Sequence, residues 1–160
     1  METSTQYEFR SASITDLSTM ISMLANDPLG AQRESANGDV SSEYRDAFEA
    51  ISNDPNNELL LICQEGTILG FLQLTYIPSL TYTGAWRAQI EGVRVSETHR
   101  GQGIGQKLVE HAIEAAKQRQ CRLVQLSSDK RRPAAIAFYK KLGFVDSHEG
   151  MKYHIESASG

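Results

Sequence analysis

One stretch of the sequence, Ile90–Gly105, decides the fold and reads IEGVRVSETHRGQGIG. Its first part alternates around Val93 and Val95 in the manner of a β-strand. Its last part holds three glycines at alternate positions, and apolar residues then recur at helical spacing as far as about Arg119. The glycines are Gly101, Gly103 and Gly105. The stretch therefore predicts a strand that leads through a glycine-rich turn into the N-terminus of a helix.

A turn of this kind is suited to binding an anion. Glycine lets the backbone approach a ligand, the first N–H groups of the helix point at it, and the helix dipole favours negative charge. Three glycines exceed what the start of a helix requires. A phosphate-bearing ligand is therefore favoured over a turn that only caps the helix.

Two common phosphate-binding motifs do not match this turn. A P-loop ends in Gly-Lys-Ser/Thr, whereas Gly105 is followed by Gln-Lys-Leu. The dinucleotide fingerprint needs a glycine where the chain has Gln106, and the gap of five residues after Val95 is too long for its first turn. Asp129 does lie at about the distance of a ribose-binding acid. The spacing nevertheless disfavours a nucleotide-dependent oxidoreductase.

Working outward, hydrophobic periodicity and turn residues predict the remaining elements. Strands are expected at about 7–12, 58–64, 68–77, 85–95, 123–127, 144–148 and 151–155. The strands at 58–64 and 68–77 are expected to form a hairpin through a turn at Glu65-Gly66, and 78–84 is expected to be a loop. Helices are expected at about 14–25, 44–51, 103–119 and 133–142, the first of them beginning at Ser13-x-x-Asp16, which resembles a capping box. This order predicts one α/β domain over residues 1–160, with a mixed central sheet of about six to seven strands flanked by about four helices. Residues 155–160 are expected to form a flexible tail.

Composition narrows the class of protein. The 160 residues are 40% hydrophobic, and the net charge of −4 argues against broad nucleic-acid binding. No apolar run approaches the ~20 residues of a membrane-spanning helix, and the polar start of the chain is unlike a signal peptide. Cys63 and Cys121 stand alone, without metal-ligand spacing, and are expected to be small buried residues. We therefore expect a cytoplasmic protein without a metal site, a membrane partner or a nucleic-acid partner.

Two motifs resemble one known family. Arg100-x-x-Gly103-x-Gly105 after a Val-x-Val strand resembles the acetyl-CoA motif of the GNAT acetyltransferases. The segment Ala135–Phe144, AIAFYKKLGF, is similar to the second signature of that family, a helix with a tyrosine followed by Leu-Gly-Phe. Together with the element order, the resemblance covers nearly the whole chain. It implies the GNAT fold and an N-acetyltransferase that uses acetyl-CoA as co-substrate.

The resemblance also implies which residues bind the cofactor. The strand before the turn pairs its backbone with the pantetheine arm, and the amides of the turn hold the pyrophosphate. The implied residues are Val93, Arg94, Val95, Arg100, Gly101, Gln102, Gly103, Ile104, Gly105, Ser128 and Arg132. Arg132 stands where the family usually has asparagine, so its role stays open between a CoA phosphate, an acidic acceptor and solvent.

Catalysis of acetyl transfer requires a neutral amine. An alkyl amine with a pKa of ~10.4 is charged at pH 7, and removing its proton costs roughly 4–5 kcal/mol. Glu91 matches the family's carboxylate on the strand before the turn, with Gly92 beside it suited to a β-bulge. The alternative is an ion pair between Glu91 and Arg87 or Arg94. Tyr139 matches the tyrosine that protonates the leaving thiolate. Core packing is its alternative role, although the preceding Phe138 is expected to be the better core residue of this helix.

The acceptor is expected to be a primary amine of a small molecule or peptide. Arg33, Arg87 and Gln89 are the candidate residues for binding it. Arg87 and Gln89 share strand parity with Glu91, so all three are expected to face one cleft. A homodimer stays open. The alternative function is a non-catalytic acyl-CoA-binding sensor or partner module of the same fold.

Overall fold

A computed structural model describes residues 6–26, 30, 34 and 40–156 of the chain. The chain divides into two compact units, Met1–Leu126 and Ser127–Gly160, and each is described by itself. The elements of the first unit are β1 (Glu8–Ser11), η1 (Ile14–Asp16), α1 (Leu17–Ala25), α2 (Ser42–Ser52), β2 (Asn57–Gln64), β3 (Thr67–Pro78), α3 (Thr81–Gly84), β4 (Trp86–Val95), η3 (Glu97–His99), α4 (Ile104–Gln118) and β5 (Leu123–Leu126). The second unit holds α5 (Pro133–Lys141).

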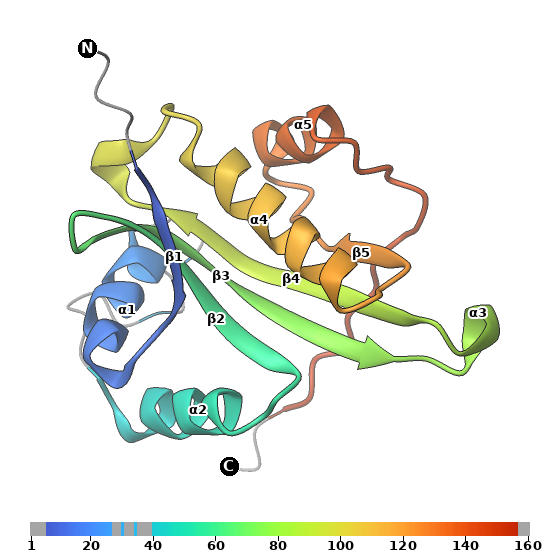
Figure 1. Cartoon of the computed structure of the whole chain (residues 1–160), viewed down its shortest axis with the longest axis horizontal. Coiled ribbons are helices and arrows are strands. Elements are labelled where there is room, and N and C mark those ends of the chain that lie inside the picture. Colours follow the sequence, from blue (N-terminus) through green and yellow to red (C-terminus); the bar gives the residue numbers. More distant parts are fainter. Residues whose placement is uncertain (1–5, 27–29, 31–33, 35–39, 157–160) are drawn as a thin grey trace. The chain divides into compact units, whose positions relative to one another are not determined.

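The sheet of the first unit has five strands in the order β1-β2-β3-β4-β5 (Figure 1). Its first four strands are antiparallel, and β5 lies parallel to β4. The predicted hairpin is confirmed: β2 and β3 are joined at Glu65 and Gly66, whose φ angles of 49° and 80° are both positive. Positive φ at both central residues is typical of the type I′ turn, whose twist matches that of the flanking strands.

Helices cover both faces of this sheet. Met20 and Met23 of α1 pack in one buried cluster with Leu61 and Phe71 of the sheet. On the other face, Ile104 of α4 and Ile62 of β2 lie beside Gly70. Ile62 follows Leu61 on β2, so its side chain points to the opposite face. The apolar run of β2 is therefore explained by burial on both faces. We call the two sides the α1 face and the α4 face.

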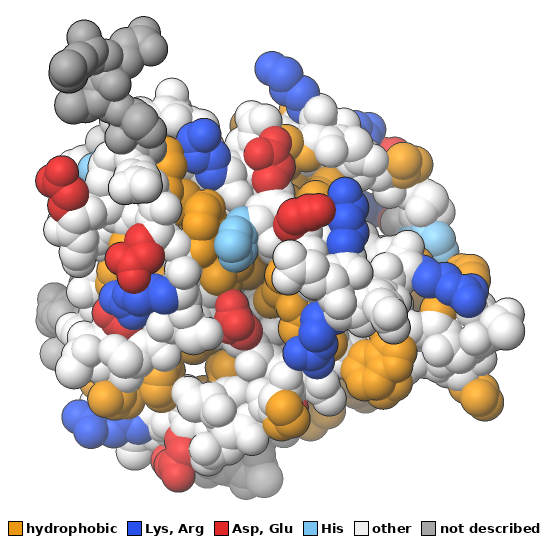
Figure 2. All heavy atoms as spheres, in the orientation of Figure 1, with side chains coloured by type: hydrophobic (Ala, Val, Ile, Leu, Met, Phe, Trp, Pro, Cys, Tyr) orange, Lys and Arg blue, Asp and Glu red, His pale blue; other side chains and the backbone are white. Residues whose placement is uncertain are grey.

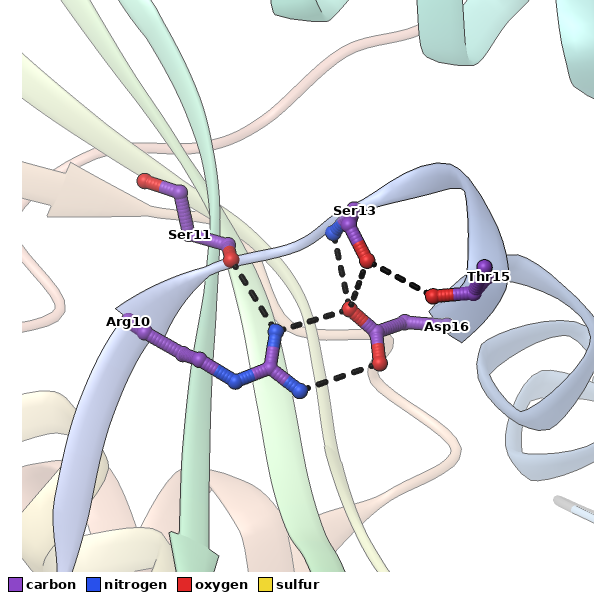
Figure 3. A network of polar contacts seen from close by, with 5 residues as sticks. All are labelled: Arg10, Ser11, Ser13, Thr15 and Asp16. Carbon is purple, nitrogen blue, oxygen red and sulfur yellow. Dashed lines mark hydrogen bonds and ion pairs between the residues drawn. The ribbon is translucent and has the colours of Figure 1, made fainter. Parts of the chain in front are cut away.

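The entrance to α1 is fixed by a network of polar side chains (Figure 3). Arg10 of β1 donates two hydrogen bonds to the carboxylate of Asp16, at 2.8 and 3.0 Å. The Ser13 backbone N–H donates to the same carboxylate at 2.7 Å, in the capping box predicted from Ser13-x-x-Asp16. The Arg10 guanidinium lowers the pKa of Asp16 from 3.8 to about 2. The network thus ties β1 to the start of the first helix.

The end of the chain differs from prediction. The segments 144–148 and 151–155 form no strand, so the described sheet has five strands rather than six or seven. Met151, Tyr153 and Ile155 alternate as in a strand, yet each is about nine-tenths exposed. Alternation indicates which residues fit one face of a sheet, but a strand also needs a neighbour for its backbone hydrogen bonds. The predicted helices are all present, and the turn α3 adds a fifth within the expected 78–84 loop.

The structure also bears on the membrane, metal, charge and cysteine features considered from the composition. Within its described residues, no helix is long and apolar enough to cross a membrane. The same residues contain no group of three or more side chains able to hold a metal ion. Acidic and basic side chains are interspersed on the face shown in Figure 2. Cys63 is buried as expected, whereas Cys121 is half-buried, and both are free thiols.

Candidate active site

The glycine-rich turn has the backbone geometry that the sequence predicted. Gly101 and Gly103 both have φ of +78°, a conformation that L side chains rarely adopt. A Cβ added at either residue would meet no atom within 4 Å, so the space above the turn is open. Gly103 is the N-cap of α4, with no side-chain cap and no acidic residue in the first helical turn. The first N–H groups of α4 are therefore directed at space that fits an anion.

Beside this turn, β4 separates from β5. The two strands pair from Arg87 with Leu123 as far as Ile90 with Leu126. In the described part of the chain, the remaining half of β4, from Glu91 to Val95, pairs only with β3. Its other edge thus presents backbone N–H and C=O groups to an extended ligand, as an added strand would use them.

A β-bulge at Gly92 sets the direction of the side chains along this open edge. Glu91 pairs with Gln73 of β3, and Arg94 pairs with Phe71, so two residues of β4 oppose one residue of β3 between them. Gly92 has φ of +64°, as in a bulge that begins with glycine. Directly paired residues point to one face, and Phe71 lies in the cluster with α1. The side chains of Glu91 and Arg94 therefore both lie on the α1 face.

Glu91 is exposed at this position. The structure shows no ion pair or hydrogen bond from its carboxylate to another described residue, including Arg87 and Arg94. The geometry therefore does not support the alternative in which Glu91 serves as an ion-pair partner. A carboxylate so placed is available to a proton-bearing ligand.

The residues predicted to bind the acceptor substrate have different contacts. Gln89 accepts a hydrogen bond from Gln125 of β5 at 2.6 Å, just before the two strands separate. Arg87 donates a hydrogen bond to the Ser79 hydroxyl. Both side chains share the face of Glu91, as their parity predicted. Arg33 lies outside the described residues.

In the second unit, Tyr139 lies on α5 within an aromatic group. Its ring packs edge-on against Phe138, with centroids 5.1 Å apart, and against Phe144 at 5.7 Å. Tyr139 and Phe138 are both half-buried, so the structure does not single out Phe138 as the core residue of this helix. Ser128 is half-buried. Arg132 is the N-cap of α5, and its carbonyl oxygen accepts hydrogen bonds from the N–H groups of Ala135 and Ile136.

Sequence reasoning missed two features of the first unit. Strict alternation from Glu91 would send Arg94 to the opposite face, and the bulge reverses this. Gly92 correctly predicted the bulge, but its consequence for the direction of Arg94 was not predicted. The second feature is a polar row on the α1 face beside Glu91, in which Asn57 accepts from Thr75 at 2.6 Å and from Gln73 at 3.4 Å. Alternation within β3 places Gln73 and Thr75 on one face, but only the pairing with β4 shows which residues they join.

These observations together indicate a class of protein. An anion-binding helix start, an open strand edge beside it and an exposed carboxylate on that strand together fit a long phosphate-bearing ligand and a second, proton-bearing reactant. The described site therefore indicates a protein that binds a phosphate-bearing ligand beside a second reactant.

Comparison with known proteins gives the family. A sequence model of the "Acetyltransferase (GNAT) family" matches residues 24–144. The aminoalkylphosphonate N-acetyltransferase of Salmonella typhimurium is 32% identical over 105 residues, which are 66% of this chain and 68% of that protein. The streptothricin acetyltransferase of Streptomyces lavendulae is 30% identical over 67% of this chain and 53% of its own length. The chain belongs to the GNAT family of acetyltransferases.

A solved structure agrees with this assignment of the fold. The crystal structure of a transcriptional regulator from Bacillus halodurans C-125 is 50% identical and superimposes with a TM-score of 0.90. The match covers 94% of this chain and 100% of that chain.

Proposed function

We propose that this protein is an N-acetyltransferase that transfers the acetyl group of acetyl-CoA to a primary amine. The observation that carries the proposal is the open half of β4, which runs beside the glycine-rich turn and bears Glu91 exposed on the α1 face. Membership of the GNAT family supports the reaction class. The free thiols of Cys63 and Cys121 accord with a cytoplasmic location.

Acetyl-CoA supplies an activated acetyl thioester. The backbone amides of the turn, from Arg100 to Gly105, hold its pyrophosphate, and the edge of Val93–Val95 binds its amide groups. A backbone N–H of this edge donates to the carbonyl oxygen as negative charge develops on it.

Glu91 accepts the proton of the ammonium group, directly or through water, so that the amine is neutral when it attacks. The new C–N bond forms as the C–S bond breaks, in a complex that holds both substrates. Tyr139 donates its phenolic proton to the departing sulfur, and the second proton of the amine, released as the amide forms, returns through water to the tyrosine oxygen. Arg87 and Gln89, with Arg33, contact the acceptor, and Ser128 and Arg132 contact the cofactor.

The relatives point to several acceptors. Their names include an aminoalkylphosphonate and streptothricin. A third relative, N-alpha-acetyltransferase 30 of Saccharomyces cerevisiae, is 32% identical over 43% of this chain, and its name adds an N-alpha amine.

The test is turnover on a panel of such amines. Purified protein, acetyl-CoA and each amine are incubated, free CoA thiol is followed with a thiol reagent, and the product is identified by mass spectrometry. We expect thiol release that depends on one class of amine, with a gain of one acetyl group on that amine. Binding of acetyl-CoA without transfer to any amine would instead identify a non-catalytic acyl-CoA-binding module.

A further inference from the structure

A buried cation lies on the α1 face of the proposed acceptor site. The side chain of Arg94 is only 8% exposed, although arginine is rarely buried in proteins. A guanidinium group keeps its charge at every physiological pH, and its burial costs free energy unless acceptors surround it. Arg94 therefore places a fixed positive charge inside the protein.

The bulge brings this charge to the same face as the proposed base. Glu91 and Arg94 pair with residues two positions apart on β3, so their Cα atoms are separated by about 7 Å along the strand. Arg94 Nη1 donates to the carbonyl oxygen of Val93 at 2.8 Å, which holds the guanidinium back against the bulge, near the strand edge proposed to bind the thioester. An amine bound at Glu91 would therefore lie on the same face of the sheet as this guanidinium, one side-chain position further along the strand.

The surroundings of Glu91 on this face are polar rather than apolar. Gln73, Thr75 and Gln89 are half-buried and lie on neighbouring rungs of β3 and β4. Such a row offers hydrogen bonds to a polar ligand and little apolar surface to an alkyl chain. The site thus combines a carboxylate, amide groups and a buried cation.

We infer that the acceptor carries an anionic group a few bonds from its amine, and that Arg94 binds this group while Glu91 takes the proton of the amine. The inference rests on the proposed function. A guanidinium has five N–H donors in a planar fork and binds two acceptors at once, so its contacts within the chain are compatible with this role. The chemical class is a short amine with a phosphonate, phosphate or carboxylate.

The experiment compares amines of matched length on the wild-type protein. β-Alanine and 2-aminoethylphosphonate carry an anion, propylamine carries none, and 1,3-diaminopropane carries a second cation. We expect kcat/KM for at least one anionic amine to exceed that for propylamine by about 10- to 100-fold, the range of a charged hydrogen bond. The two anionic amines distinguish a phosphonate site from a carboxylate site.

Two substitutions test whether a preference for anionic amines depends on Arg94. In Arg94→Met the ratio of kcat/KM between the anionic amine and propylamine is expected to fall to near one, while Arg94→Lys, which keeps a point charge, retains part of it. The ratio is the readout because a general loss of activity cancels from it. Arg122→Met, at an exposed arginine that binds the Tyr82 carbonyl, is the matched control and should keep the wild-type ratio.

The outcomes separate the two proposals. A wild-type protein that acetylates amines without preferring anionic ones overturns the inference and leaves the proposed function standing. A preference that persists in folded Arg94→Met also overturns it. If Arg94→Met does not fold, Arg94→Lys takes its place. A wild-type preference for anionic amines that is reduced in Arg94→Lys supports the inference, and an unreduced preference overturns it. Failure to acetylate any amine overturns the proposed function, and the inference with it.

Discussion

Gly70 of β3 lies against the carbonyl oxygen of Arg94 so closely that a Cβ at position 70 would be 2.7 Å from it. The two residues lie at the end of the bulge, where Gly70 pairs with Val95. An atom at that distance overlaps the oxygen, so one strand would have to move. The path of β4 through the proposed cofactor site therefore depends on a residue of the neighbouring strand.

Gly70→Ala tests this dependence. We expect a loss of about 1–3 kcal/mol in the free energy of unfolding, as for an overpacked core, and weaker acetyl-CoA binding because the edge of β4 is displaced. Chemical denaturation and calorimetric titration measure the two effects. Gly150→Ala is the control, since its Cβ would meet only Ser127 Oγ at an ordinary 3.8 Å. Unchanged stability in Gly70→Ala would show that β3 and β4 can move apart at this point without loss of stability.

Asp16→Asn tests the network at the start of α1. The pKa of Asp16 is lowered from 3.8 to about 2 by Arg10, so its stabilising effect is present above pH ~4 and is lost as pH falls towards 2. We expect the substitution to lower the free energy of unfolding by about 1–3 kcal/mol at pH 7. The difference should shrink between pH 4 and pH 2 in urea denaturation. Asp146→Asn, which removes an exposed pair with Lys140, should change stability much less than Asp16→Asn does. A difference for Asp16→Asn that is constant with pH would contradict the account.

Glu91→Gln tests the proposed base. Glutamine keeps the size of the side chain but cannot accept the proton, so we expect kcat/KM at pH 7 to fall by about 10²- to 10⁴-fold. Activity should recover in part at higher pH, because more of the amine is then neutral. Glu114→Gln, at an exposed glutamate of α4, is the control. A pH–rate profile identical to wild type would assign the proton to water or to another residue.

Tyr139→Phe separates catalysis from packing in α5. The ring contacts with Phe138 and Phe144 survive the change, so the melting temperature should change little. If the hydroxyl protonates the departing sulfur, turnover should fall by ~10²-fold or more with acetyl-CoA affinity retained. Tyr153→Phe, at an exposed tyrosine of the same unit, is the control. Full activity would make the hydroxyl dispensable, and unfolding would make it structural.

The sequence predicted most of the first unit because its signals are local. Alternating apolar residues, the Glu65-Gly66 turn and the glycines before α4 each specify nearby backbone, and the structure places the corresponding elements within one or two residues. The face of Arg94 could not be predicted in this way, because it depends on register with β3. The final strands were predicted wrongly since their alternation carries no information about a pairing partner.

The central claim is that the turn from Arg100 to Gly105 binds acetyl-CoA, and calorimetric titration of Gly103→Val tests it most directly. Gly66→Val is a closely matched control, because Gly66 also has positive φ, at +80°, and open space around it, but lies in the β2–β3 turn. Both substitutions impose similar backbone strain, of about 1–2 kcal/mol. We predict that wild type and folded Gly66→Val bind acetyl-CoA and that folded Gly103→Val does not. Equal affinity in Gly103→Val and wild type would contradict the account.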